Sequence, residues 1–210
     1  MNTIDVGTPT FESMDEAMAT MGFVKTSAST ATTHIYRWGN DSEGKCLIGL
    51  EDTMYLHYDF GSTSQGIVDL GAYLKICYEP LARGGIALGF VMNSSNTLIQ
   101  IAFVAPKSIN DDWVFLPYSA DYNYVCDYST DRTLSYSQNS IYGSIGAFSN
   151  DVQIHKTYNG TRFMDNLYRT ALQPQLSWGG NVRATIGTTE YLLFRPVNGT
   201  YNLWAVELPS

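Results

Sequence analysis

Apolar and polar positions alternate along most of this chain, a pattern that predicts β-strands. The alternation is clearest at 86–92 and 97–104, two runs joined by the turn-forming residues 93–96. Successive side chains of a strand point to opposite faces of a sheet, so every second residue shares a face. In both runs one such face is apolar and contains Ile86, Leu88, Phe90, Met92, Ile99, Ile101 and Phe103. We therefore expect a hairpin that lies centrally in a sheet.

Two further groups of strand-like runs flank this hairpin, one toward each end of the chain. The first group comprises 34–38, 45–50 and 53–60, and the last comprises 182–186, 190–195 and 201–208. Turn-forming residues, Gly187-Thr188-Thr189 and Asn198-Gly199, separate the runs of the last group, so each group is expected to form a meander. Shorter strands are expected at 73–78, 113–116 and 152–155, and 161–172 fits either a strand or a short helix.

The strand pattern is interrupted near the N-terminus, where a short helix is expected. Ser13-Met14-Asp15-Glu16 has the S-x-x-E form of a capping box, and Gly22 is a typical helix stop. The apolar residues in between, Met14, Ala17, Met18 and Met21, follow helical spacing. We expect this face to pack in the core. Because methionine is also adaptable at protein surfaces, a protein interface formed by Met14, Met18 and Met21 is the alternative.

Two stretches outside the helix also lack the alternation. Residues 23–32 are rich in Ser, Thr and Ala and predict a loop or a weak strand, and residues 61–71 predict a Gly-, Ser- and Gln-rich loop. No internal repeat and no Pro- or Gly-rich linker divides the chain. The expected fold is mainly β, an antiparallel β-sandwich or barrel-like domain with a short N-terminal α-helix. Residues 1–22 would form an N-terminal arm and the helix, and 23–210 a single β-rich domain.

The amino-acid composition suggests how much of the surface is covered by partner proteins. Of the 210 residues only 15% are charged, against about a quarter in typical proteins, and 15 are tyrosine. Protein interfaces are similarly depleted in Lys, Glu and Asp and enriched in aromatic residues. We therefore expect a subunit whose surface is largely covered by partners; a monomer with a Ser-, Thr-, Asn- and Gly-rich surface is the alternative. A net charge of −8 argues against binding to nucleic acid or to an anionic membrane surface.

The location of the protein is expected to be cytoplasmic at synthesis. The first residues show neither the basic nor the apolar region of a signal peptide, and no run is long enough for a membrane span. The three cysteines, Cys46, Cys77 and Cys126, are widely spaced and odd in number, which favours reduced, buried thiols over disulfides. They form no C-x-x-C pair of the kind that binds zinc.

Few residues suggest catalysis or metal binding. His57 and Asp59 would share one face of a strand and could hold a metal, but a cross-strand polar pair is the ordinary interpretation. The sequence contains neither a Gly-rich phosphate loop nor a G-x-S-x-G motif. We therefore expect no catalytic residue, no metal and no cofactor. Scattered carboxylates leave a glycan-acting hydrolase as a remote alternative.

A tyrosine-rich region between residues 118 and 142 has three interpretations. It contains Tyr122, Tyr124, Tyr128, Tyr136 and Tyr142, mixed with Ser, Asp and Asn. These side chains would lie half-buried with the hydroxyl outward, form a protein interface, or stack on a glycan.

The closing segment resembles a known class of proteins. It is similar to the ends of structural proteins of tailed-phage virions at Asn166-Leu167-Tyr168-Arg169, Asn181-Val182-Arg183, Ile186-Gly187, Glu190-Tyr191-Leu192 and Leu203-Trp204-Ala205-Val206. The region of resemblance covers about a fifth of the chain. The resemblance implies a non-enzymatic subunit of the head, neck, tail or baseplate, assembled in the host cytoplasm. Its partners would be copies of itself and other virion proteins. A β-sandwich module that binds a carbohydrate or receptor is the alternative function.

Overall fold

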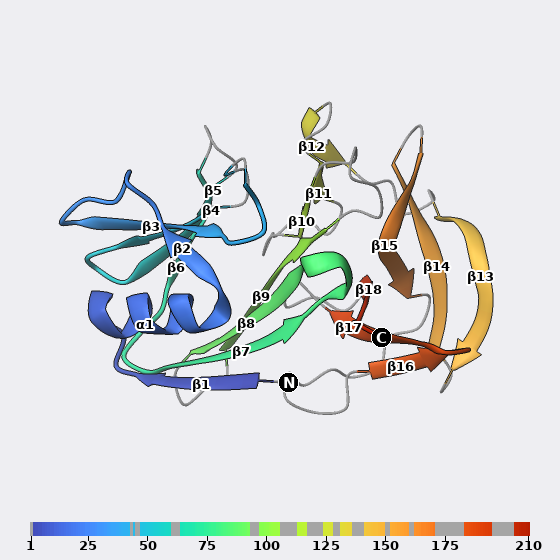
Figure 1. Ribbon diagram of the computed structural model, residues 1–210, viewed down its shortest axis with the longest axis horizontal. Helices are drawn as coiled ribbons and strands as arrows, with labels where there is room; N and C mark the ends of the chain where they lie inside the picture. The colour runs from blue at the N-terminus through green and yellow to red at the C-terminus, as the bar shows by residue number, and fades with distance from the viewer. Residues whose placement is uncertain are drawn as a thin grey trace. The chain divides into compact units, whose positions relative to one another are not determined.

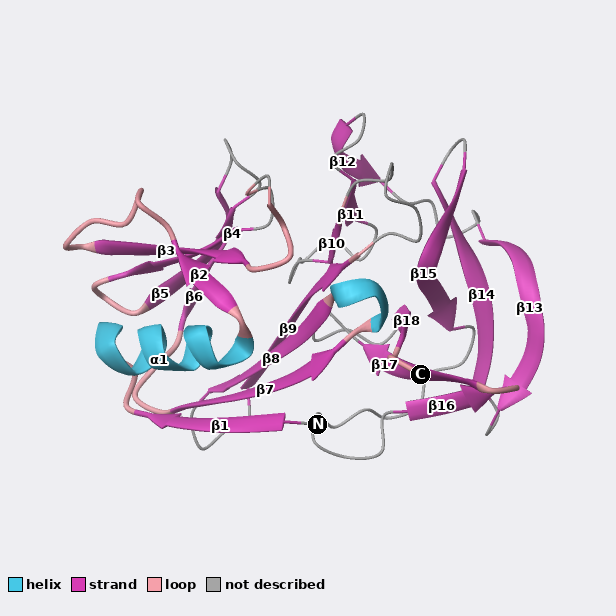
Figure 2. Cartoon of the chain, viewed as in Figure 1, coloured by secondary structure: helices cyan, strands magenta, loops and turns pink. Residues whose placement is uncertain are grey.

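The computed structural model describes the chain in segments. They are 2–42, 44, 47–59, 64–92, 97–105, 113–116, 124–127, 131–135, 141–149, 152–159, 162–170, 183–194 and 204–210. Strands predominate, they pair in antiparallel sheets, and one short α-helix lies near the N-terminus (Figures 1 and 2), which confirms the predicted mainly β class.

The chain divides into two compact units. The first unit contains Met1–Tyr78 and Leu88–Ile99, and the second contains Glu79–Ala87 and Gln100–Ser210. Three strands, β7 (Leu74–Pro80), β8 (Ile86–Met92) and β9 (Thr97–Val104), each continue from one unit into the other. The helix belongs to the first unit, and the predicted division at residue 22 stays a prediction.

A five-stranded meander makes up much of the first unit (Figure 1). Its strands follow chain order: β2 (Phe23–Lys25), β3 (Thr33–Trp38), β4 (Leu47–Glu51), β5 (Tyr55–Asp59) and β6 (Ser64–Asp69). The predicted runs became β3, β4 and β5. The predicted loop at 61–71 was wrong in part, because β6 pairs along β5, with Leu56 opposite Val68. β6 is an edge strand, where polar residues such as Ser64 and Gln65 are tolerated.

A seven-stranded sheet contains the predicted central hairpin. Its order is β1 (Asn2–Gly7), β7, β8, β9, β10 (Val114–Leu116), β11 (Tyr124–Asp127) and β12 (Asp131–Ser135). Strands β8 and β9 are neighbours in the middle, and the predicted apolar face is at most 3% exposed at every residue. The opposite face is also buried, at Ala87 and Ala102 among others. Burial on both faces explains the central position.

The sheet of the second unit contains the predicted closing meander. Its order is β13 (Ile141–Ser149), β14 (Val152–Asn159), β15 (Arg162–Thr170), β18 (Trp204–Glu207), β17 (Thr189–Phe194) and β16 (Arg183–Ile186). The ambiguous segment at 161–172 forms strand β15. Ile186 pairs with Thr189 across a two-residue turn whose first residue, Gly187, has φ 62°, as hairpin turns of this type require.

Helix α1 (Phe11–Met21) begins earlier than its capping pattern predicted. Thr10 is the N-cap, and a reciprocal capping box links it to Ser13 rather than joining Ser13 to Glu16. In this capping box the hydroxyl of Ser13 takes the place of the Glu or Gln side chain, so the S-x-x-E pattern does not identify it. The predicted end is confirmed: Gly22 caps the helix with φ 97°, and its N–H bonds the carbonyls of Met18 and Ala19.

A core substitution on α1 tests this packing. Met18 is 0% exposed, so Met18→Ala should lower the free energy of unfolding by about 2–5 kcal/mol, through lost apolar burial and the cavity left behind. Chemical denaturation measures the change. Val24→Ala is the control, because Val24 is 46% exposed and should change stability by less than about 0.5 kcal/mol. Equal effects of both variants would contradict the described burial.

Candidate functional site

The sequence-predicted interface residues fall into two groups. Three of the tyrosines lie outside the described residues: Tyr122, Tyr128 and Tyr136. The other two, Tyr124 on β11 and Tyr142 on β13, have only their backbone described. The tyrosine interface therefore stays a prediction. Met14, Met18 and Met21 are 0%, 0% and 5% exposed, so these side chains pack inside the chain, as the core interpretation of this helix face expects.

The predicted pair of His57 and Asp59 stays a prediction, because only the backbone of Asp59 is described. The side chain of His57 has a neighbour on the adjacent strand. Gly49 lies opposite His57 on β4, which makes Glu51 its diagonal neighbour on the same face. His57 Nε2 lies 2.9 Å from Glu51 Oε1, although the approach is outside hydrogen-bonding geometry, so the contact is an ion pair only when the ring is protonated. Among the described residues no three His, Cys, Asp or Glu side chains are grouped for a metal.

A polar cluster in the first unit joins helix α1 to two strands. We call Asp15, Lys25, His34 and Tyr36 the Asp15 cluster. Asp15 Oδ1 lies 2.8 Å from His34 Nδ1 and accepts a 2.8 Å bond from the Tyr36 hydroxyl, while Asp15 Oδ2 accepts a 3.0 Å bond from Lys25 Nζ. Lys25 Nζ also lies 3.0 Å from His34 Nε2. One carboxylate thus receives three side-chain donors from β2 and β3.

The contacts fix the tautomer of His34. An ammonium group can only donate, so His34 Nε2 accepts from Lys25 and Nδ1 carries the hydrogen that is donated to Asp15. Phe11 stacks on the ring with a centroid distance of 3.7 Å and an interplanar angle of 13°. Both ring nitrogens and one ring face therefore make contacts within the chain, as is typical of a histidine that stabilises the fold.

The same contacts shift two pKa values. Burial acts to raise the pKa of Asp15, but the hydrogen bonds from Tyr36, Lys25 and His34 outweigh it and hold that pKa below its ordinary value. Burial, together with the hydrogen bond to Asp15 and its negative charge, raises the pKa of Tyr36 well above its ordinary value.

Sequence reasoning did not find the Asp15 cluster. One signal was available: Phe11 and Asp15 are one helical turn apart, and His34 and Tyr36 share a strand face. What was missing was the packing of α1 against β2 and β3.

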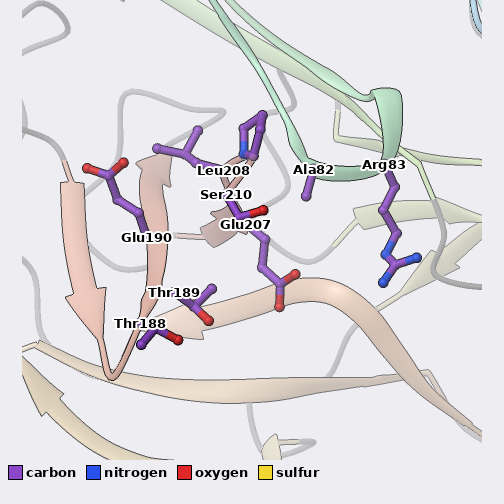
Figure 3. A pocket seen from close by; sticks show the side chains of 9 residues that line it. Ala82, Arg83, Thr188, Thr189, Glu190, Glu207, Leu208 and Ser210 are labelled. Carbon is purple, nitrogen blue, oxygen red and sulfur yellow. The ribbon is translucent and has the colours of Figure 1, made fainter.

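A pocket of about 620 Å³ lies in the second unit (Figure 3). We call it the η1 pocket, because one wall is the short 3₁₀ turn η1 (Ala82–Gly84), through Ala82 and Arg83. The other walls are residues 188–190, at the turn between β16 and β17, and residues 207–210, at the end of β18. Three segments far apart in sequence thus meet around one cavity, and the sequence did not predict any of them as part of a site.

An arginine bridge supports the wall formed by β17. Arg183 on β16 donates from Nη1 to Glu190 Oε2 at 2.9 Å and from Nη2 to Glu79 Oε1 at 2.5 Å. Glu79 is 9% exposed, so this ion pair is partly shielded from solvent. One guanidinium therefore joins β7, β16 and β17 and partly neutralises the carboxylate of Glu190.

Comparison with protein-family models gave no match, and comparisons with curated protein sequences and with solved structures gave none either. In the part of the chain that the structure describes, no helix has the length and apolar character needed to span a membrane. The function must therefore be argued from the residues themselves.

The Asp15 cluster predicts an acid-dependent loss of stability. A carboxyl whose pKa is lower in the folded than in the unfolded chain stabilises the fold above its unfolded pKa, and this contribution is lost as the pH falls through the folded pKa. Stability should fall below about pH 4, the ordinary Asp value. Asp15→Asn should lower stability at pH 7 by about 1–2 kcal/mol and flatten the acid slope, measured by denaturation at several pH values. Glu16→Asn, at an exposed position, should leave the slope unchanged.

At alkaline pH, the contribution of Tyr36 makes stability fall as the pH rises. Its pKa is raised in the fold, so its contribution is complete below the unfolded pKa of about 10 and is lost as the pH rises above that value. Thermal unfolding between pH 8 and pH 11 should show a steeper decline for the parent chain than for Tyr36→Phe. A matched comparison is Tyr55→Phe, at a 37% exposed tyrosine. Identical slopes for the parent and Tyr36→Phe would contradict the described environment of this hydroxyl.

Proposed function

We propose that this chain is a non-enzymatic structural subunit of a tailed-phage virion, made and assembled in the host cytoplasm. It would act through interfaces with copies of itself and with other virion proteins. The observation that carries the proposal is that the described sheets end in edge strands, above all β1.

Each of the described sheets ends in two edge strands. They are β1 and β12, β2 and β6, and β13 and β16, of which β13 and β16 contact each other. An edge strand presents unpaired backbone N–H and C=O groups, which can pair with a strand of another chain. Strand β1 is an example: it pairs with β7 alone among the described strands, its Asn2, Thr3 and Asp5 are exposed, and it contains neither Lys nor Pro. Such edges suit a subunit that is joined to neighbours.

Composition and the resemblance also support assembly. A surface with few charged residues and many tyrosines is typical of interfaces. The segments that resemble virion proteins occupy adjacent strands: Leu167 lies opposite Val206, Val206 opposite Leu192, and Leu192 opposite Arg183. They therefore form neighbouring strands of one sheet rather than scattered similarities.

The assembly state tests this proposal. The purified protein should form oligomers of defined size in light scattering, and rings or lattices in negative-stain images, because virion subunits associate with closed or lattice symmetry. A monomer whose mass is independent of concentration would overturn the proposal.

Lysine substitutions locate the interface. Asn2→Lys and Thr185→Lys each place a charge at an exposed position of an edge strand, on β1 and β16, where lysine opposes strand pairing. Ala19→Lys adds the same charge at an exposed position of α1 and is the control. We expect at least one edge variant to shift the oligomer toward monomer, while Ala19→Lys assembles as the parent does.

A further inference from the structure

Strand β1 has a regular stretch that ends at a bulge. Residues 2–5 lie opposite residues 75–78 of β7 in antiparallel order, and the register shifts before Gly7. Gly7 has φ 68°, in the left-handed region that favours glycine. Beyond this bulge the chain leaves the sheet and continues to α1 (Figure 1). Regular strand pairing along the outer edge of β1 is therefore available at residues 2–5.

The one charged side chain of β1 already has partners within the chain. Asp5 Oδ1 accepts a 3.2 Å bond from the N–H of Gly7, and Asp5 Oδ2 accepts a 2.8 Å bond from the hydroxyl of Tyr73. Lys75 lies opposite Asp5 on β7, which places a positive charge beside the negative one. An isolated carboxylate opposes the removal of water by a neighbouring strand, and a carboxylate with these partners opposes it less. The charge of Asp5 is therefore compatible with a second strand beside β1.

The other described edge strands are less suited to pairing. Basic side chains are a typical protection of a sheet edge, and they occur on β2, β12 and β16 at Lys25, Arg132 and Arg183. Strand β6 contains Gly66, a residue that weakens strands, and β13 contacts β16. Residues 2–5 of β1 include no basic residue and no glycine. Among the edges that the structure describes, β1 is thus the one most open to strand addition.

The sequence of β1 is complementary to a second copy of itself in one antiparallel register. A two-fold axis perpendicular to the sheet must pass between two identical residues, because directly opposite side chains share a face. With Asp5 at the axis, two carboxylates would lie opposite each other, which is destabilising. With Thr3 at the axis, the polar Asn2 would lie opposite the apolar Ile4.

Placing Ile4 at the axis avoids both mismatches. The β-branched side chains of the two Ile4 residues would then lie opposite each other, a favourable cross-strand pair. The hydroxyl of Thr3 would lie opposite the carboxylate of Asp5, to which it can donate. Apolar residues thus meet apolar residues, and donors meet acceptors.

We propose that β1 pairs in antiparallel orientation with β1 of a second copy of this chain, with Ile4 of both copies at the two-fold axis. The pairing would join the sheets that contain β1 into one continuous sheet. A self-complementary patch of this kind is the basis of two-fold symmetric dimers. The inference rests on the proposed association of copies of this chain, and it specifies the strand, the orientation and the register of one interface.

Disulfide cross-linking tests the register. Directly opposite residues of antiparallel strands have Cα atoms about 4.5–5.5 Å apart, a separation that a disulfide bridges. Ile4→Cys should therefore give a covalent dimer on oxidation with diamide, joined between the two residues at position 4. Electrophoresis without reductant measures the yield, mass spectrometry of the peptides identifies the joined positions, and the parent chain with Cys46, Cys77 and Cys126 gives the background. A folded Ile4→Cys variant without this cross-link would overturn the proposal.

Two matched variants distinguish this register from other contacts. In the proposed pair the residues at position 5 are two positions out of line, so their Cα atoms are roughly 8 Å apart, beyond the reach of a disulfide. Asp5→Cys should therefore lose the cross-link. Ala19→Cys, at an exposed position of α1, should also stay at the background and reports random collisions. If either control dimerises as readily as Ile4→Cys, the register is wrong.

Hydrogen exchange of the parent chain provides a test without substitution. Backbone N–H groups on the outer edge of β1 become hydrogen-bonded in the proposed pair, and hydrogen bonding protects them from exchange. At a concentration where light scattering shows association, at least one amide among residues 3–5 should exchange at least about tenfold more slowly than in dilute protein. Mass spectrometry of the N-terminal peptide measures the rate, and this measurement decides if Ile4→Cys does not fold.

Light scattering on the same samples separates the two proposals. Association without protection of β1 and without the cross-link at position 4 would overturn the pairing of β1, while the proposed assembly of copies would stand. A monomer at every concentration would contradict both.

Discussion

The described side chains of β8 and β9 are buried on both faces of the sheet, apart from the half-buried Val91. Ile86, Leu88 and Phe90 on one face, and Ala87 on the other, are each at most 1% exposed. A strand buried on both faces can satisfy its backbone groups only through neighbouring strands, so partners must lie on both sides of the pair. β7 and β10 supply them. Burial of β8 and β9 therefore determines which strands must lie beside them in the seven-stranded sheet.

What could be predicted from the sequence is the part that depends on local pattern. Alternation identified β8 and β9 and the closing meander, and Gly22 marked the end of α1 because the left-handed conformation favours glycine. The first residue of α1 was misplaced because Thr10 and Ser13 cap the helix with hydroxyls alone. Strand β6 was missed because an edge strand needs no apolar alternation: its position follows from pairing with β5, which is not visible in its own residues.

The candidate sites could not be predicted, because each depends on contacts distant in sequence. The Asp15 cluster joins residues of α1, β2 and β3, and its bond from Tyr36 to Asp15 spans 21 positions. The bond between Arg183 and Glu79 spans 104. Local patterning carries no information on such pairs. A chain with only 15% charged residues nevertheless brings several of them together at these two places. Charge concentrated in this way fixes the relative position of elements, since Asp15 and Arg183 each engage more than one partner.

Arg183 shows how one charged residue positions several strands. It lies on β16 and donates through Nη1 to Glu190 on β17 and through Nη2 to Glu79 on β7. Opposite charges attract each other more strongly where solvent is excluded. Since the side chain of Glu79 is 11% exposed and that of Glu190 is 42% exposed, the pair of Arg183 with Glu79 is the better shielded of the two and contributes more to holding β16 in its place.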